Sequence, residues 1–377
     1  FSQIESDRPQ IEVNQRFPLQ YPELRPFFLE GQEIFRIMGT TAVHTRTIVD
    51  PQFGVKLTGK VGKTALGIVV ANDEAPGKVG SPNDPAFGKS AQFVLGRVLY
   101  DFYSESYLGA IVTDREFLDS HSRLTGFDGN FRLGRNHRVG FSGMVTDRQD
   151  QAGLQRTGHM FDVHFRKEGR NLSYMVLHRE INPDFQTDAG FIRRVDLKNT
   201  MGNVSYRWWP ESWVINWGPR INYDRNYDFQ GVLQDEGMEA SLNAQFARNM
   251  GMNVQITRDM ERFGGINFWK TRYSFGGGMN TSRRVSFGGR VSAGDQIRFV
   301  ADPFLGSSTE SNLNMTLRPV SRLQSEINVN TSRLTDPRDG SEIFNVKIVR
   351  SLTVYQFTER LLVRNIMQRN TFNKTLD

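Results

Sequence analysis

The segment Met238-Glu239-Ala240-Ser241-Leu242-Asn243-Ala244-Gln245-Phe246 decides the fold class of this chain. Apolar residues occupy every second position of this segment, and polar residues occupy the positions between them. Successive side chains of a β-strand point to opposite faces of its sheet, so the pattern is typical of a strand with one apolar and one polar face. An amphipathic helix would need apolar residues three or four positions apart. The segment therefore predicts a β-strand.

The same alternation recurs along most of the chain, most clearly at 161–166, 252–257, 285–293 and 313–318. The connections between such segments alternate between short and long. The short ones lie near 62–64, 103–106, 135–137, 168–171, 209–212, 247–250, 281–284, 319–322 and 356–359, and the long ones near 74–90, 116–122, 148–156, 181–199, 224–236, 258–269, 295–310 and 334–342. Outer-membrane barrels combine short periplasmic turns with longer outer loops. We therefore expect an all-β fold, a transmembrane antiparallel β-barrel of about 18 to 22 strands.

A soluble multi-sheet β protein is the alternative reading of this alternation. Its apolar face would be dominated by large branched side chains, whereas many positions on the apolar face here are Gly, Ala or Met. The composition agrees with a barrel, because a mean hydropathy of −0.49 is compatible with strands that expose apolar residues only at alternate positions. No stretch approaches the roughly 20 apolar residues that a membrane-spanning helix requires.

Charge and cysteine content exclude several function classes. The 47 Lys and Arg residues are scattered singly, so a basic arm that binds nucleic acid is not expected. The chain contains no cysteine, which excludes disulfides, thiolate nucleophiles and cysteine-ligated metals. We expect no cofactor.

Residues 1–38 lack the alternation and contain Pro9, Pro18, Pro22 and Pro26, each of which removes a backbone hydrogen-bond donor. We expect an irregular lead-in over 1–38 that packs at the barrel mouth or partly plugs the lumen. Residues 39–377 are expected to form the barrel, with a first strand proposed at 39–48.

Basic residues at polar positions of the expected strands are candidates for the lumen wall. They are Lys56, Lys60, Arg132, Arg166, Arg207, Arg220, Arg290, Arg318 and Lys347, accompanied by Asn243, Asn328 and Asn330. A cationic wall would concentrate anions in an open lumen. The alternative is that these bases pair across strands with Asp128, Asp162, Glu239 and Glu326.

Aromatic residues cluster near expected strand ends, as in the girdles that lie at membrane interfaces. The clearest group is Tyr206, Trp208, Trp209, Trp213, Trp217 and Tyr223. Basic residues also occupy several short turns, namely Lys63, Arg135, Arg170, Arg248, Arg283, Arg284 and Arg322. They would form a positive periplasmic rim, which is either ordinary solvation or a docking surface for an envelope protein.

Motifs that carry catalysis or bind metals are weak in this sequence. Gly59-Lys60-Val61-Gly62-Lys63-Thr64 resembles the end of a phosphate-binding loop, but the first glycine of that motif would fall at Leu57, so we interpret it as a hairpin turn. The six histidines lack a metal-ligand spacing. Acidic residues of the long loops could bind Ca²⁺, yet they lack the D-x-D-x-D spacing and are interpreted as solvated. We therefore expect no metal and no enzymatic activity.

A family resemblance covers nearly the whole chain. The run from Phe17-Pro18 through Tyr21-Pro22-Glu23-Leu24-Arg25-Pro26 to Gly31, the segment 56–60, the segment 188–196 and the late hairpin with Tyr355-Gln356-Phe357-Thr358 resemble the bacterial envelope family known as domain of unknown function 5916. The resemblance implies an outer-membrane barrel, preceded by a domain similar to carbohydrate-binding family 9 and ending in an aromatic strand. This sequence contains neither of those parts, so an incomplete barrel at the C-terminus is expected.

The sequence thus predicts a non-enzymatic barrel in the outer membrane of a Gram-negative-type bacterium. It would act as a pore or passage, or as a membrane anchor for envelope cargo. The alternative is a plugged structural barrel that scaffolds other subunits of an outer-membrane complex. The expected partners are the lipid bilayer, lipopolysaccharide, and envelope proteins at the periplasmic rim or in the lumen.

Overall fold

The computed structural model describes residues 13–374, which form one antiparallel sheet of 18 strands. The strands are β1 (Pro51–Val61), β2 (Thr64–Asp73), β3 (Ala91–Tyr103), β4 (Ser106–Phe117), β5 (Ser120–Leu133), β6 (His137–Gln149), β7 (Gln155–Glu168), β8 (Leu172–Ile181), β9 (Leu197–Tyr206), β10 (Val214–Tyr227), β11 (Leu233–Phe246), β12 (Met250–Phe263), β13 (Ile266–Met279), β14 (Val285–Arg298), β15 (Phe304–Val320), β16 (Leu323–Thr335), β17 (Glu342–Gln356) and β18 (Leu362–Lys374). Each strand is hydrogen-bonded to the next strand in the chain. The predicted all-β antiparallel fold is confirmed.

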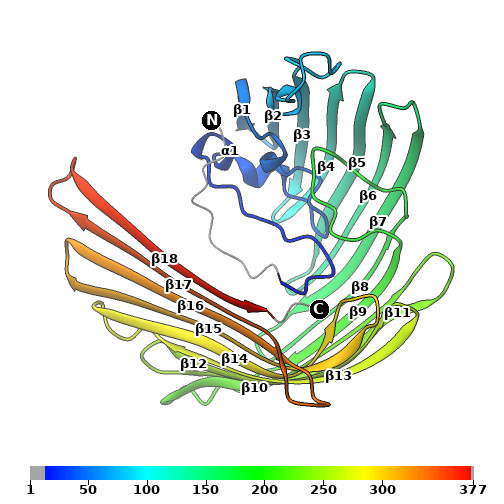
Figure 1. Ribbon diagram of the computed structural model, residues 1–377. Coiled ribbons are helices and arrows are strands. Elements are labelled where there is room, and N and C mark those ends of the chain that lie inside the picture. The colour runs from blue at the N-terminus through cyan, green and yellow to red at the C-terminus, as the bar shows by residue number, and fades with distance from the viewer. Residues whose placement is uncertain (1–12, 375–377) are drawn as a thin grey trace.

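The sheet curls into an incomplete barrel, with an opening between β18 and β1 (Figure 1). Among residues 13–374, no hydrogen-bonded register joins these two strands. Both strands therefore present an edge with free backbone donors and acceptors.

Two sequence predictions about the connections are wrong. The connection expected over 116–122 consists only of Leu118 and Asp119, and the one expected over 258–269 only of Gly264 and Gly265. In both places the flanking strands extend through residues whose polarity predicts a loop. Strand residues near the ends of a barrel are polar on both faces, so polarity alone does not mark where such a strand stops.

The lead-in is longer than the sequence predicts, because the first strand begins at Pro51 and residues 39–48 form no strand. The described lead-in is 13–50, and residues 1–12 of the expected lead-in lie outside the described residues. Its helices are short: α1 (Pro26–Leu29) and the 3-10 helices η1 (Gln32–Phe35) and η2 (Thr45–Thr47), while η3 (Ala75–Gly77) lies in the β2–β3 loop. Figure 1 shows the lead-in running along the concave side of the sheet.

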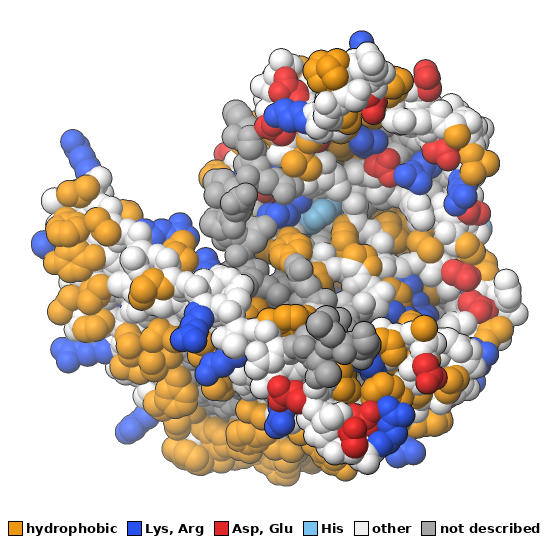
Figure 2. All heavy atoms as spheres, viewed as in Figure 1, with side chains coloured by type: hydrophobic (Ala, Val, Ile, Leu, Met, Phe, Trp, Pro, Cys, Tyr) orange, Lys and Arg blue, Asp and Glu red, His pale blue; other side chains and the backbone are white. Residues whose placement is uncertain are grey.

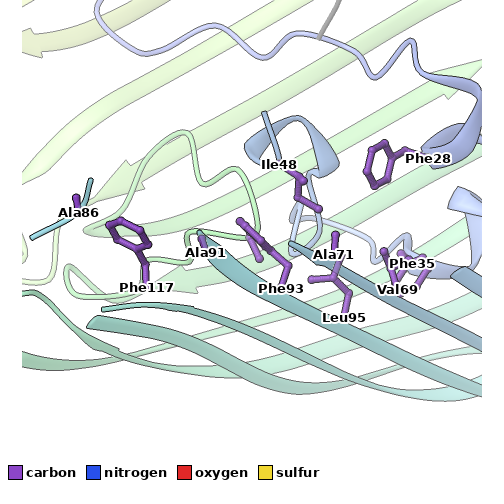
Figure 3. Close-up of a cluster of buried hydrophobic side chains, with 11 residues drawn as sticks. Phe28, Phe35, Ile48, Val69, Ala71, Ala86, Ala91, Phe93, Leu95 and Phe117 are labelled. Carbon is purple, nitrogen blue, oxygen red and sulfur yellow. The ribbon is translucent and has the colours of Figure 1, made fainter. Parts of the chain in front are cut away.

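We call β1–β9 the first barrel half and β10–β18 the second barrel half. Apolar side chains of the lead-in pack on the inner wall of the first half. Phe28, Phe35 and Ile48 are buried against Phe93 and Leu95 of β3 (Figure 3). A second cluster joins lead-in residues to six neighbouring strands, β4 to β9, and to the loop 182–196. It contains Ile37, Ala42, Ile111, Leu124, Met144, Met160, Ile181, Phe185 and Leu197. Burial of each large apolar side chain stabilises the fold by about 1.5–3 kcal/mol. The hydrophobic core therefore lies inside the barrel.

A buried ion pair fixes the middle of the lead-in. Glu23 Oε2 accepts hydrogen bonds from Arg25 Nη2 at 2.7 Å and from Thr45 Oγ1 at 2.7 Å. Arg25 also donates to the carbonyl oxygens of Ile48 and Thr45 at 2.7 and 2.8 Å. We call Glu23, Arg25 and Thr45 the clasp, because they hold residues 23–25 of the lead-in to residues 45–48 near its end.

The clasp keeps the Glu23 carboxylate ionised despite its burial. Burial by itself would raise the pKa of Glu23, but the hydrogen bonds from Arg25 and Thr45 outweigh that effect and lower the pKa from 4.5 to about 2. The stabilisation that comes from this carboxylate is therefore fully present above pH 4.5 and is lost as the pH falls toward 2.

Replacement of the clasp carboxylate should loosen the lead-in at neutral pH. At pH 7, Glu23→Gln should lower the free energy of local opening of residues 20–50 by about 1–3 kcal/mol, because it weakens a charge-assisted hydrogen bond to buried Arg25. Amide hydrogen exchange measures this quantity, and the difference from the native chain should shrink as the pH falls from 4.5 toward 2. The exposed Glu33→Gln variant is the control. Equal exchange in Glu23→Gln and the native chain at pH 7 would contradict the role of the clasp.

Candidate functional site

A belt of buried charged residues crosses the inner wall beneath the lead-in. On β3, Arg97 extends over β4, and its Nη1 lies 2.6 Å from Asp128 Oδ1 on β5, with side chains 0% and 3% exposed. The crossing requires Gly109 on β4, because a Cβ there would lie 2.7 Å from Arg97 Nη2. Arg97 Nε also donates to the carbonyl oxygen of Ile34 in the lead-in, at 3.3 Å.

The belt continues on β7 and β8. Asp162 Oδ2 accepts two hydrogen bonds from Arg179, at 3.0 and 2.9 Å, and Asp162 Oδ1 lies 3.3 Å from His164 Nδ1. Gly39 of the lead-in has φ +87° and packs directly on this pair, so that a Cβ at Gly39 would lie 2.4 Å from Arg179 Nη2. The belt residues Arg97, Asp128, Asp162, His164 and Arg179 thus hold lead-in residues 34–39 against the wall.

The belt contains an acid, a histidine and a nearby serine, which invites comparison with a catalytic triad. Ser142 lies directly opposite Asp162 across β6 and β7, but its Oγ has no hydrogen-bond partner among residues 13–374. His164 lies over Gly140, where a Cβ would be 2.4 Å from its Nε2. A triad needs a hydrogen bond between nucleophile and base and access for the substrate. Neither condition is met, because Ser142 and His164 are unbonded to each other and both are buried.

The second barrel half carries a different inner wall, made of amides that bridge alternating charges. Arg220 Nε on β10 donates to Asn222 Oδ1 at 3.1 Å, and Asn222 Nδ2 donates to Glu239 Oε1 on β11 at 2.8 Å. Gln255 Nε2 on β12 donates to Glu239 Oε2 at 2.9 Å, and Arg290 Nη1 on β14 donates to Gln255 Oε1 at 2.9 Å. We call Arg220, Asn222, Glu239, Gln255 and Arg290 the amide chain.

Neutral polar residues surround the amide chain on the same face. The cross-strand register brings Asn243, Asn253, Gly276, Arg290, Asn312 and Asn330 into one row from β11 to β16. Asn253 donates to Asn243 at 2.9 Å, and Asn312 donates to Asn330. This wall therefore offers amide and hydroxyl groups to the lumen, with the charge of Arg290 opposed by that of Glu239.

The lead-in reaches this second wall near the loop ends of its strands. Arg16 Nη1 lies 2.8 Å from Glu261 on β12, and Asn14 Nδ2 donates to the carbonyl oxygen of Ile297 on β14 at 2.7 Å. Beside this contact, Val13 and Gln15 face Arg290 and Glu310 across a cavity of about 420 Å³. The lead-in thus crosses the lumen and borders a polar cavity on the wall of the second half.

The predicted lumen bases fall into three groups. Seven lie on the inner face by strand register: Lys56, Lys60, Arg132, Arg166, Arg220, Arg290 and Arg318. Arg207 lies in the turn after β9 and contacts Trp209, so its placement on a lumen strand is wrong. Lys347 is also misplaced, because it lies opposite Thr331 on the outer face of β17. On that strand the inner face is apolar, since Val346 and Ile348 pack in a buried cluster with Val13 and Phe304.

The predicted inter-strand pairing of bases and acids is present with other partners. Asp128 and Asp162 pair with Arg97 and Arg179, which the sequence patterns do not single out. Glu239 and Glu326 accept hydrogen bonds from amides. Arg97 interrupts the apolar series Phe93, Leu95 and Leu99 on the inner face of β3, and that interruption is the sequence signal that could have identified it.

The predicted aromatic group lies at the short-turn ends of β9 and β10, with Tyr223 farther along β10. Tyr206, Trp208, Trp213, Trp217 and Tyr223 are all exposed, Trp213 to 61%. Trp208 and Trp217 pair in an isolated bridge with ring centroids 4.6 Å apart. Trp209 instead donates its Nε1 hydrogen to the carbonyl oxygen of Arg170 in the adjacent turn, at 2.9 Å.

The segment 59–64 forms the β1–β2 hairpin, in which Val61 pairs with Thr64, as its interpretation as a turn predicts. Residues 13–374 contain no group of three or more His, Asp or Glu side chains placed to hold a metal ion.

None of the helices between residues 13 and 374 is both long and apolar enough to span a membrane.

Three comparisons relate this chain to known proteins. A search of curated proteins finds no match. Among solved structures, the chain is similar to the one described as "Crystal structure of Acinetobacter baumannii OccAB3". The sequence identity is 8% and the TM-score is 0.41, and the similarity covers 81% of this chain and 92% of that chain. The model of the family described as domain of unknown function (DUF5916) matches residues 117–374. This chain therefore belongs to the DUF5916 family.

Proposed function

We propose that this protein is a non-enzymatic barrel of the bacterial outer membrane that provides a passage for small polar solutes. The lead-in fills the lumen along the first barrel half, and solutes pass along the amide-lined wall of the second half.

The opposite polarity of the two faces of β10–β14 carries this proposal. Their outer faces expose large apolar side chains, including Met238 at 55% and Phe275 at 57%. Their inner faces carry the amide chain. A soluble sheet would bury its apolar face, whereas a membrane barrel turns that face to lipid and its polar face to water. Figure 2 shows the band of hydrophobic side chains on the outside of this part of the molecule.

Barrel size also supports a passage. Eight strands enclose a space that side chains can fill, and barrels of 16–18 strands leave an aqueous channel. The described strands number 18, so a segment such as the lead-in can occupy part of the lumen without filling it.

The chemistry of the second wall suggests a solute class. Amides both donate and accept hydrogen bonds, so this wall can replace the hydration of uncharged polar groups. Arg290 gives the wall a local positive charge, but Glu239 is linked to it through Gln255. We infer a weak preference for anions and good passage of neutral polar solutes.

A plugged scaffold is the second candidate function. The observation that favours it is the number of buried contacts that the lead-in makes, namely the hydrogen bonds and ion pair of the clasp and the packing of residues 34–39 on the belt. Glu261 and Asp235 add contacts with Arg16 on the opposite wall. In this case the folded and inserted protein would conduct no ions.

Charge substitutions in the amide chain should shift ion selectivity in opposite directions. Glu239→Gln removes a negative charge from the wall and should raise the anion preference, while Arg290→Gln should lower or reverse it. Reversal potentials of single channels under a salt gradient measure both effects. The outward-facing Arg258→Gln variant is the control. Identical reversal potentials in all three variants would contradict a passage along this wall.

Release of the clasp should open the lumen further. The double variant Glu23→Ala with Arg25→Ala removes both buried charges, so the lead-in loses its central tie. Single-channel conductance should then rise, on the order of twofold, because the lead-in occupies the part of the lumen beside β2–β9. Arg123→Gln, which breaks an ion pair on the outer face, is the matched control. Silence of both the native chain and the clasp variant, each shown to be inserted, would favour the plugged scaffold.

A further inference from the structure

The outer face of the last three strands differs from the outer face of the other strands. The register places three rows side by side on this face: Arg333, Asn345 and Asn373; Thr331, Lys347 and Thr371; and Val329, Val349 and Arg369. Lys347 is thus flanked on both neighbouring strands by a threonine directly opposite it, at the separation where cross-strand side chains interact. Arg369 lies in the next row. We call Arg333, Thr331, Lys347, Arg369 and Thr371 the basic patch.

The two central cations of the patch have no acidic partner. Two other basic residues of the outer face are neutralised or covered: Arg123 pairs with Glu116 at 2.7 Å, and Arg258 lies over the ring of Trp269. Arg333 pairs with Glu342 at 2.8 Å. Lys347 and Arg369 form no ion pair within residues 13–374, and both are exposed.

The depth of the patch matches the outer interface of the membrane. Lys347 and Arg369 lie about a third of the way along β17 and β18 from the loop ends of these strands. Tilted strands of this length exceed the roughly 25 Å apolar band of an outer membrane, so their loop ends extend beyond it. The long side chains of Lys and Arg can then reach the headgroups from just inside the band.

An uncompensated cation on a lipid-facing strand costs about 2–4 kcal/mol near the middle of the membrane. That cost falls when the charge meets an anion. Phosphate accepts charge-assisted hydrogen bonds from both Lys and Arg, and flanking hydroxyls can bind its remaining oxygens or the adjacent sugar.

We propose that the basic patch binds the phosphorylated glucosamine headgroup of lipopolysaccharide. This inference rests on the proposed function, because it requires the loop ends to lie at the outer leaflet. Lys347 and Arg369 bind the phosphate, and Thr331 and Thr371 donate hydrogen bonds beside it. The acyl chains then lie along the apolar outer faces of the neighbouring strands β13–β15.

Titration of the purified, delipidated full-length protein with bis-phosphorylated lipid A tests this proposal. The native chain should bind lipid A at least about tenfold more tightly than Lys347→Gln with Arg369→Gln, which loses two charge-assisted hydrogen bonds. Lipid A stripped of its phosphates should bind both chains equally weakly. The conservative variant Lys347→Arg with Arg369→Lys should restore binding. The matched control, Arg123→Gln with Arg258→Gln, removes two other outer-face cations and should bind like the native chain.

Several results would overturn the proposal. Equal affinity in the native and Gln variants would do so, and so would affinity that ignores the phosphates. Equal affinity for phosphatidylglycerol would exclude lipopolysaccharide as the specific occupant. An envelope protein that co-purifies only with the native chain, while lipid A affinity is unchanged, would assign the patch to that protein instead. Insertion and conductance in vesicles are measured on the same samples. If the protein conducts but its lipid A binding does not depend on the patch, only this inference is refuted. If the protein fails to insert, the proposed function is refuted as well.

Discussion

The antiparallel hydrogen-bond ladder from β1 to β18 is the constraint on which the rest of the structure depends. It satisfies the backbone groups of each strand with those of the next, and it forces neighbouring residues to opposite faces. The chain must therefore meet two different environments along almost its whole length. Along β10–β14 these are an apolar exterior and a polar interior. Along β2–β7 the inner face is apolar near the strand ends that join the long loops, and the lead-in packs on that apolar surface. On this inner wall, buried charged residues are paired across strands, as Arg97 reaches Asp128 over Gly109.

The sequence predicts this structure well where one face is apolar and the other is polar. The alternation over 238–246 lies within β11, and the strands at 252–257 and 285–293 lie within β12 and β14. Prediction weakens where a tertiary contact changes the rule. On β17 the inner side chains Val346 and Ile348 pack in a cluster with Val13. The apolar face of β17 is therefore the inner one, opposite to that of β10–β14, and Lys347 points outward. Local pattern cannot reveal this reversal, because Val13 lies far away in the sequence.

The candidate site shows the same division. The sequence identified Arg220, Arg290 and Glu239 as inner-wall charges, since each occupies a polar position of an alternating strand. It did not reveal that amides link them, because Asn222 and Gln255 become bridges only through the register of three neighbouring strands. The clasp is likewise invisible to periodicity. Glu23 and Arg25 are close in sequence, but their burial depends on the return of the chain at Thr45. Proline content marks the lead-in as irregular and says nothing about where it packs.

The central claim is that the lead-in covers one half of the inner wall and leaves the amide-lined half open to water. The absence of native cysteine makes this directly measurable, because each introduced thiol reports on a single position. The experiment introduces single cysteines at inner positions 95, 111 and 124 of the first half and at 243, 253 and 312 of the second half. Each variant, intact and inserted in lipid, is then treated with a membrane-impermeant thiol reagent. Rapid modification of the second set with protection of the first is the predicted result. Equal modification of both sets, or protection of both, would contradict a half-filled lumen.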